Sequence, residues 1–228
     1  ANACKMQNNV PDGMLWNRVL TEGCDAIDGA VGTYPNLSRT YVPLACQHCE
    51  NPACMKVCPT GATYKDEQGR VEIDYDRCIG CRMCMAACPY NARVFNWGEP
   101  KYSPDFVYGD SSVPARRKGV AEKCTLCKER TDAGEEPMCV VCCPTHARVF
   151  GDLDDPNSEV SKVIAANRAT PLKPLENAKT NVAYLNIPTV FLAGSVYLPG
   201  DETGDEPADG AVVTLTCRDT NAVTTVKT

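Results

Sequence analysis

The sequence from Cys78 to Pro89 reads CIGCRMCMAACP, and its four cysteines are separated by two, two and three residues. A proline directly follows the fourth cysteine. The chain has sixteen cysteines in 228 residues, and two further quartets share the C-x2-C start and the C-x3-C-P end of this stretch. They are Cys46-x2-Cys49-x4-Cys54-x3-Cys58-Pro59 and Cys124-x2-Cys127-x11-Cys139-x3-Cys143-Pro144.

Cysteines at this density form disulfides, bind structural zinc or hold iron–sulfur clusters. Disulfide frameworks belong to short secreted chains, and two intervening residues are a poor spacing for a bridge. Zinc ribbons need two C-x2-C pairs roughly 15–20 residues apart, which leaves a third thiol without a role. The run from Cys78 to Pro89 has the spacing of bacterial ferredoxins, in which the fourth cysteine ligates a different cluster from the first three. The spacing therefore favours iron–sulfur clusters over zinc, and zinc over disulfides.

An internal repeat follows the fourth cysteine of each quartet. The copies are CPTGATYK at residues 58–65, CPYNARVF at 88–95 and CPTHARVF at 143–150. Proline fixes its own φ and ends the preceding turn. Between the first two quartets, residues 62–74 read as a hairpin that turns at Gln68-Gly69. Each unit is therefore predicted to be a loop, a short helix and a strand, with two units facing each other around two clusters.

Over residues 1–180 the cysteine runs, including their x4 and x11 variants, resemble the four-cluster iron–sulfur subunit of molybdopterin oxidoreductases of the dimethyl sulfoxide reductase family. The resemblance implies that motif one pairs with motif four, and motif two with motif three. In each pair, three cysteines of one motif are completed by the last cysteine of the other. The implied ligand sets of [4Fe–4S] clusters are Cys46, Cys49, Cys54 with Cys88; Cys78, Cys81, Cys84 with Cys58; and Cys124, Cys127, Cys139 with Cys4.

Cys4 lies in Ala3-Cys4-Lys5, which resembles the end of a first motif. We interpret the chain as a fragment, with three clusters complete here and four in the full protein. Cys143 then ligates the cluster of three cysteines upstream of Ala1. In the alternative interpretation each quartet closes its own cluster, and Cys4 is a lone surface thiol.

The remaining cysteines and the two histidines have no place in these sets. Cys24 and Cys217 are expected to be thiols that bind no metal, and Cys142 to be a buried apolar filler. His48 and His146 lie inside the cluster loops, where hydrogen bonding or local charge would shift a potential. No nucleophile–base pair or phosphate loop is evident, so we predict no catalytic residue.

The predicted fold is α+β, with tandem ferredoxin-like units followed by a truncated all-β module. The four-cluster domain spans residues 1–152 with an insertion at 97–121, where members of the resembled family contact their large subunit. Residues 153–184 hold a helix starting near Asn157 or Ser158, then a proline-rich linker. Residues 185–228 read as strands of a β-sandwich or transthyretin-like module, similar to the small subunit of pyrogallol–phloroglucinol transhydroxylase.

Composition excludes some functions. A net charge of −6 and a pI near 5.0 argue against nucleic-acid binding. The compact basic cluster, residues 116–118, either docks on an acidic partner or is a solvated turn. No apolar run approaches the ~18 residues of a membrane-spanning helix, so we expect no direct membrane span.

The function implied by the resemblance is that of a non-catalytic electron-transfer subunit. Its clusters would pass electrons between a molybdopterin-containing catalytic subunit and a redox partner, such as a membrane anchor or another electron donor. The alternative is a free-standing polyferredoxin that carries electrons between several enzymes. The resemblance also implies a prokaryotic protein, either cytoplasmic or exported with its partner to the outer face of the cytoplasmic membrane.

Overall fold

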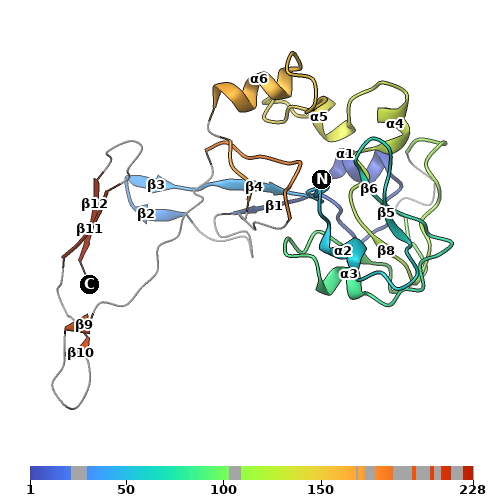
Figure 1. The fold of residues 1–228 in the computed structure, drawn as a ribbon, viewed down its shortest axis with the longest axis horizontal. Helices are drawn as coiled ribbons and strands as arrows, with labels where there is room; N and C mark the ends of the chain where they lie inside the picture. Colours follow the sequence, from blue (N-terminus) through green and yellow to red (C-terminus); the bar gives the residue numbers. More distant parts are fainter. Residues whose placement is uncertain are drawn as a thin grey trace. The chain divides into compact units, whose positions relative to one another are not determined.

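A computed structural model describes residues 1–21, 30–102, 109–167, 169–172, 178–186, 197–198, 206–207, 212–216 and 223–227. The chain divides into two compact units, residues 1–189 and 190–228. The first unit contains all the helices of the described residues, and Figure 1 shows them as short ribbons joined by long loops. Among the described residues, no helix is long and apolar enough to cross a membrane.

The helices are short because prolines and cluster loops bound them. Pro52 is the N-cap of one helix and Pro137 of another. Pro59, Pro89 and Pro144 follow the fourth cysteines, where proline would break a continuing helix. The helices are α1 (Asn2–Gln7), α2 (Ala53–Lys56), α3 (Met83–Ala86), α4 (Lys128–Asp132), α5 (Met138–Val141) and α6 (Glu159–Ala166).

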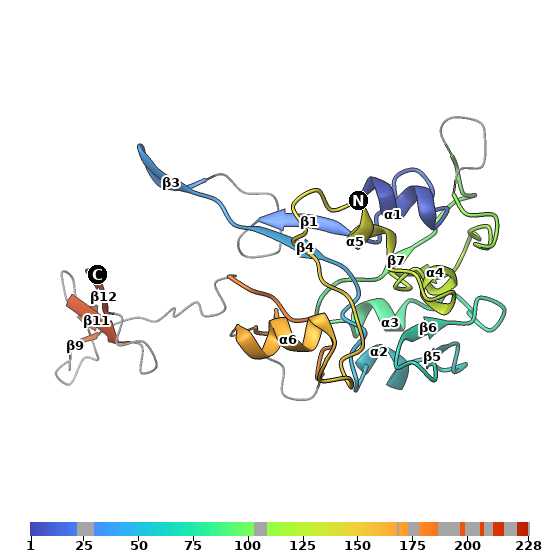
Figure 2. The ribbon, with the colours of Figure 1, turned by 90° about the horizontal axis from the view of Figure 1, so that it is seen from above.

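Two helix pairs bring distant quartets together. Helix α2 packs beside α3, and α1 packs beside α5, in both views of the ribbon (Figures 1 and 2). The first pair joins the quartets that begin at Cys46 and Cys78. The second pair joins the N-terminal segment to the quartet that begins at Cys124. Short helices paired in this way match the predicted arrangement of facing ferredoxin-like units.

The strands of the first unit form two-stranded antiparallel sheets. The predicted hairpin at residues 62–74 is confirmed, with Thr63 opposite Ile73. Gly69 has a φ of +78°, and the Asp66 carboxylate accepts the amides of Gln68 and Arg70 at 3.1 and 2.8 Å. The sheets pair β1 (Arg18–Thr21) with β4 (Tyr41–Leu44), β2 (Val31–Thr33) with β3 (Asn36–Ser38), β5 (Thr63–Lys65) with β6 (Val71–Ile73), and β7 (Val94–Phe95) with β8 (Ala121–Glu122).

The apolar core is small and includes cysteines. One cluster of buried residues consists of Cys4, Val10 and Trp16. A second consists of Leu44, Tyr90 and Ala92, and three cysteines, Cys46, Cys49 and Cys88, pack against it. Several polar side chains are as deeply buried as the apolar ones. Packing of the first unit therefore depends on what the cysteines hold.

The predicted helix after the last quartet is confirmed as α6. Ser158 is its N-cap, and the Ser158 Oγ accepts the amide of Ser161 at 3.2 Å. In the second unit, β9 (Tyr197–Leu198) pairs with β10 (Glu206–Pro207), and β11 (Val212–Thr216) pairs with β12 (Val223–Lys227). Residues 189–196, which belong to the predicted all-β module, lie outside the described residues.

Candidate metal centres

Each cysteine loop has left-handed backbone at two positions, and both positions recur in all three quartets. The residue before the second cysteine of each quartet has a positive φ, at His48 (42°), Gly80 (69°) and Leu126 (55°). Glycine adopts this conformation freely, and asparagine and histidine adopt it more often than other residues. The third residue after the fourth cysteine behaves the same way, at Gly61 (63°), Asn91 (48°) and His146 (48°).

Gly80 has a second reason to be glycine. A Cβ atom built on it would lie 2.2 Å from the carbonyl oxygen of Gly119. The loop between Cys78 and Cys81 can therefore approach the end of the insertion only without a side chain at position 80.

Both histidines are turn residues in this arrangement. His48 is buried, and its Nδ1 accepts the amide of Val71 at 3.1 Å. Burial, with the neighbouring Lys123, lowers the pKa of His48 to about 3, so the ring is neutral. His146 is exposed. The sequence analysis did not predict that the two histidines occupy left-handed turn positions. The glycines at the equivalent positions, Gly61 and Gly80, were the available sign of this backbone conformation.

Group 1 comprises the thiols of Cys46, Cys49, Cys54 and Cys88. The structure brings Cys88, from the second quartet, to three cysteines of the first. Burial, followed by the negative charges of Cys46, Cys54 and Cys88, raises the pKa of Cys49 to about 11. Cys46, Cys49 and Cys88 also pack against the same cluster of buried apolar residues.

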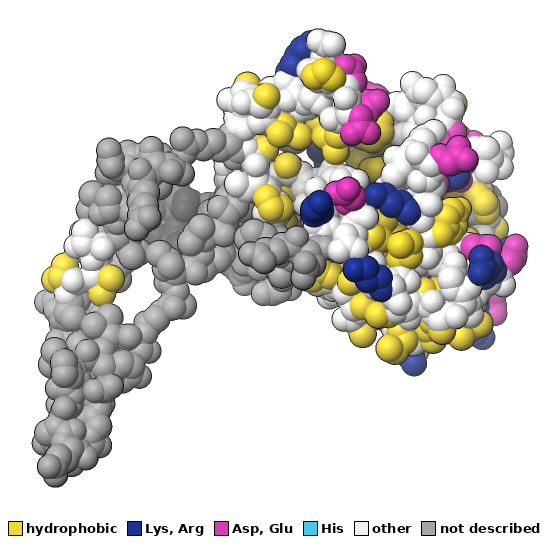
Figure 3. All heavy atoms as spheres, viewed as in Figure 1, with side chains coloured by type: hydrophobic (Ala, Val, Ile, Leu, Met, Phe, Trp, Pro, Cys, Tyr) yellow, Lys and Arg dark blue, Asp and Glu magenta, His cyan; other side chains and the backbone are white. Residues whose placement is uncertain are grey.

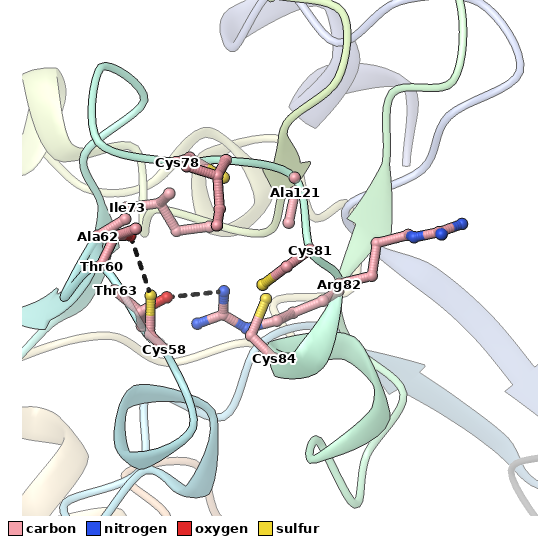
Figure 4. Close-up of a pocket in the computed structure, with 13 residues that line it drawn as sticks. Cys58, Thr60, Ala62, Thr63, Ile73, Cys78, Cys81, Arg82, Cys84 and Ala121 are labelled. Atoms are coloured by element: carbon pink, nitrogen blue, oxygen red, sulfur yellow. Dashed lines mark hydrogen bonds between the residues drawn. The ribbon is translucent and has the colours of Figure 1, made fainter.

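Group 2 comprises the thiols of Cys58, Cys78, Cys81 and Cys84, which line one cavity. Figure 4 shows the four cysteines around this cavity, with Cys58 facing Cys81 and Cys84. Burial raises the pKa of Cys58, but hydrogen bonds from the Thr63 amide and from Thr60 outweigh it and lower the pKa to about 7.

Group 3 comprises the thiols of Cys4, Cys124, Cys127 and Cys139. Burial, then the charges of Cys127 and Cys139, raises the pKa of Cys4 to about 12. The Asn8 Nδ2 lies 3.7 Å from the Cys4 Sγ and 3.4 Å from the Cys127 Sγ, and donates to both. Helix α1 runs past Cys4 to Gln7 because lysine, and not proline, follows this cysteine.

The three groups are neighbours, with group 1 between the other two. The charge of Cys46 in group 1 contributes to the raised pKa of Cys124 in group 3, after burial and Cys4. On the other side, the Arg93 Nη2 donates to the Cys54 Sγ of group 1 at 3.0 Å. The same side chain lines the cavity of group 2 beside Cys84. Distant parts of the sequence thus form a row of thiols through the first unit.

The remaining predicted cysteines lie apart from these groups. The Cys143 Sγ accepts the Ala147 amide at 3.3 Å and lies 3.5 Å from the Thr145 hydroxyl. Cys142 is exposed, with its Sγ 3.4 Å from the Met138 Sδ. The prediction that Cys142 fills the core is wrong, because α5 is a single turn that ends before this residue. Cys24 and Cys217 lie outside the described residues.

The donor set fits iron–sulfur clusters. Each group consists of four soft thiol ligands, the donor set of [4Fe–4S] clusters. Among the described residues, no three cysteine, histidine or acidic side chains are placed to hold a single metal ion. An iron–sulfur cluster does not require its ligands to converge on a single metal ion, because each thiolate binds a different iron. The raised pKa values of Cys4 and Cys49 mean that these thiols stay protonated until a bound cation replaces the protons.

The basic cluster at residues 116–118 is only partly at the surface. Arg116 is 8 % exposed, and its guanidinium carbon lies 4.8 Å from the Trp16 ring centre and 5.8 Å from that of Tyr75. It is therefore a buried packing residue. Arg117 and Lys118 remain at the surface, where each forms an ion pair with an acidic side chain.

Comparison with known proteins defines the class first. Residues 37–103 and 111–153 match the family described as 4Fe-4S dicluster domain. The match covers all three complete quartets, and it identifies the bound groups as [4Fe–4S] clusters. The prediction of iron–sulfur chemistry is confirmed.

Similar proteins then define the family. The chain is 54 % identical over 189 residues to a Halobacterium salinarum protein named provisionally as a dimethyl sulfoxide reductase iron–sulfur subunit, covering 80 % of this chain and 71 % of that one. It is 42 % identical to a selenate reductase subunit of Mesobacillus selenatarsenatis, covering 80 % and 65 %. It is 37 % identical to the arsenate respiratory reductase iron–sulfur subunit of Shewanella sp. strain ANA-3, covering 80 % and 88 %. The chain belongs to this family of iron–sulfur subunits of oxidoreductases.

Proposed function

We propose that the chain is the electron-transfer subunit of an oxidoreductase complex whose catalytic subunit carries molybdopterin. The observation that carries the proposal is the row of three neighbouring thiol groups, which joins buried and surface parts of the first unit. Bound [4Fe–4S] clusters supply one-electron chemistry. The chain's own residues hold the clusters in a row, tune them and exclude water, and they perform no bond chemistry.

The ligands follow the three thiol groups. Group 1 holds one cluster, group 2 a second and group 3 a third, so that each is completed by a cysteine from another motif. This assignment is supported by the shared cavity of group 2 and by the mutual charge effects within groups 1 and 3. Cys143 lies outside the three groups and would supply a ligand to a fourth cluster.

Group 2 is the place where electrons are exchanged with a redox partner. Cys81 is exposed, and the apolar side chains of Ile79 and Met83 beside it are 66 % and 53 % exposed. Figure 3 shows hydrophobic side chains gathered on the face that carries α2 and α3. An apolar rim around an accessible cluster ligand suits a partner that must approach closely and exclude water.

Partner capture tests the proposal. The chain, purified through a tag from cells that make it, is expected to bring down a larger subunit containing molybdenum, in roughly equal amount. The substrate belongs to that subunit. The three relatives are named for dimethyl sulfoxide, selenate and arsenate reductases, so electron transfer is the role they share. Recovery of the fully loaded chain alone, able to reduce several unrelated enzymes, would support the polyferredoxin alternative.

Metal analysis gives a simpler expected result. The anaerobically reconstituted chain should bind iron and acid-labile sulfide in equal amounts, and its broad visible absorption should bleach on reduction. The reason is the all-thiol composition of the three groups. Stoichiometric zinc without sulfide would contradict the assignment.

Cys4→Ser tests group 3. We expect this variant to lose or weaken one cluster while the other two remain, because one iron loses its protein ligand. Iron content and the electron paramagnetic resonance (EPR) spectrum of the reduced chain measure the effect. Cys142→Ser is the matched control, since Cys142 is exposed and lies outside the groups. Equal iron and equal spectra in both variants would make Cys4 an ordinary thiol.

The domain boundaries remain those predicted, with residues 1–152, 153–184 and 185–228 as proposed segments. The hairpin of β11 and β12 supports a β-sandwich or transthyretin-like module at the C-terminal end. We place the protein in a prokaryotic cell, either in the cytoplasm or exported with its partner to the outer face of the cytoplasmic membrane.

A further inference from the structure

Arg93 is a buried cation between two of the thiol groups. Its side chain is 3 % exposed. The Nη2 donates to the Cys54 Sγ of group 1 at 3.0 Å, and Arg93 lines the cavity of group 2 together with Cys84. The Nη1 donates to the Thr63 Oγ1 at 3.3 Å. One guanidinium therefore lies against ligands of two groups.

The negative partners of Arg93 are cysteine side chains in their thiolate form. Burial disfavours the charged form of Arg93, whereas the negative charges of Cys54 and then Cys84 favour it. The net effect is a raised pKa of Arg93. Lys123, another deeply buried cation, differs in this respect. Its Nζ lies 3.9 Å from a carboxylate oxygen of Glu72, so much of its charge is compensated. A buried charge needs a compensating partner, and for Arg93 the thiolates are that partner.

The position of Arg93 in the repeat explains how it reaches both groups. Arg93 is the fifth residue after Cys88, and Thr63 is the fifth residue after Cys58. The two equivalent positions meet where the two units face each other, and Arg93 donates to Thr63 across this junction. The long side chain thus extends from this junction and lies between the group 1 and group 2 sites. Threonine at position 63 is too short to do the same from the other side.

We propose that Arg93 sets the reduction potentials of the group 1 and group 2 clusters together, an inference that rests on the cluster assignment above. Reduction of either cluster adds one negative charge, which a guanidinium bonded to a thiolate ligand stabilises. An electron that moves between the two clusters oxidises one and reduces the other. Because Arg93 lies against ligands of both, it raises both potentials and leaves the difference between them largely unchanged.

The test is an EPR-monitored redox titration of the full chain and of Arg93→Gln. The glutamine removes the charge and keeps a polar side chain. We expect the equilibrium constant for reduction to fall at least tenfold at both clusters, which is about 59 mV for a one-electron couple. The group 3 cluster should change much less. Signals are assigned with Cys88→Ser for group 1 and Cys58→Ser for group 2.

Two further variants separate charge from packing. Arg93→Lys keeps the charge, so its potentials should stay closer to those of the unaltered chain than to those of Arg93→Gln. Arg117→Met removes an exposed arginine, whose side chain is 56 % exposed, and should shift neither potential. An Arg93→Gln chain that holds all its clusters with unchanged potentials, or with only one shifted, would overturn the inference. Absence of clusters in the unaltered chain would instead overturn the proposed function.

A spectroscopic measurement covers the case in which Arg93→Gln fails to assemble. In the unaltered chain labelled with 15N-arginine, pulsed EPR should detect a guanidinium nitrogen coupled to both the group 1 and the group 2 signals. Both couplings should be absent from the Arg93→Lys chain. A coupling at one signal only, or at neither, would contradict a shared arginine.

Discussion

Removal of iron from the chain is expected to unfold the first unit rather than leave a folded apo form. In the part of this unit that the structure describes, the helices have at most eight residues, and isolated helices shorter than ~12–15 residues are marginal in water. The sheets described there have two strands each, which are barely stable alone. The apolar clusters contain or contact Cys4, Cys46, Cys49 and Cys88. Without the metal, little remains to offset the loss of chain entropy, so metal binding and folding are coupled.

Tryptophan fluorescence and far-ultraviolet circular dichroism measure this unfolding. Trp16 is 3 % exposed and packs in the cluster with Cys4, whereas Trp97 is 69 % exposed. In the Trp97→Phe variant, Trp16 is the sole reporter, and its emission should move to longer wavelength when a chelator removes iron. The wavelength is preferred to the intensity because the clusters absorb broadly. An iron-free chain that kept both its emission wavelength and its dichroism would show that side-chain packing alone holds the fold.

The sequence predicted the features that depend on local spacing. The hairpin at residues 62–74 follows from its alternation and from Gln68-Gly69, and α6 follows from a serine cap before a helical pattern. The class of cofactor follows from the cysteine spacing, since that spacing matches a chemistry with few alternatives. In each case the signal lies within one short window of residues.

Features that depend on distant residues were not predictable. Arg116 sits in a run of basic residues, but it is buried because Trp16 and Tyr75, far away in the sequence, cover it. Arg93 reads as an ordinary strand residue, and only its contact with Cys54 shows its role. The histidines were interpreted from their chemistry, although backbone φ explains them. A single sequence shows side-chain type, whereas burial depends on what the fold brings against it.

Cys88→Ser should damage the group 1 cluster and spare the cluster of its own quartet. Cys88 belongs in sequence to the quartet that begins at Cys78. In the structure it packs with Cys46 and Cys49 against Leu44, Tyr90 and Ala92. Its charge also contributes to the raised pKa of Cys49. The iron at that corner would lose its thiolate, so we expect loss or conversion of one EPR signal and a fall in iron content by about one to four atoms per chain.

The spared cluster makes this result a test of the ligand map. Group 2 takes Cys58 as its fourth thiol, and all four of its cysteines line one cavity that Cys88 does not reach. The Cys58→Ser variant should therefore give the complementary pattern, with the group 2 signal lost and the group 1 signal kept. The exposed Cys142→Ser variant should keep every signal. If each quartet instead closed its own cluster, Cys88→Ser would remove the group 2 signal and Cys58→Ser the group 1 signal. The two variants together thus distinguish crossed from local ligation, because the two maps predict opposite losses.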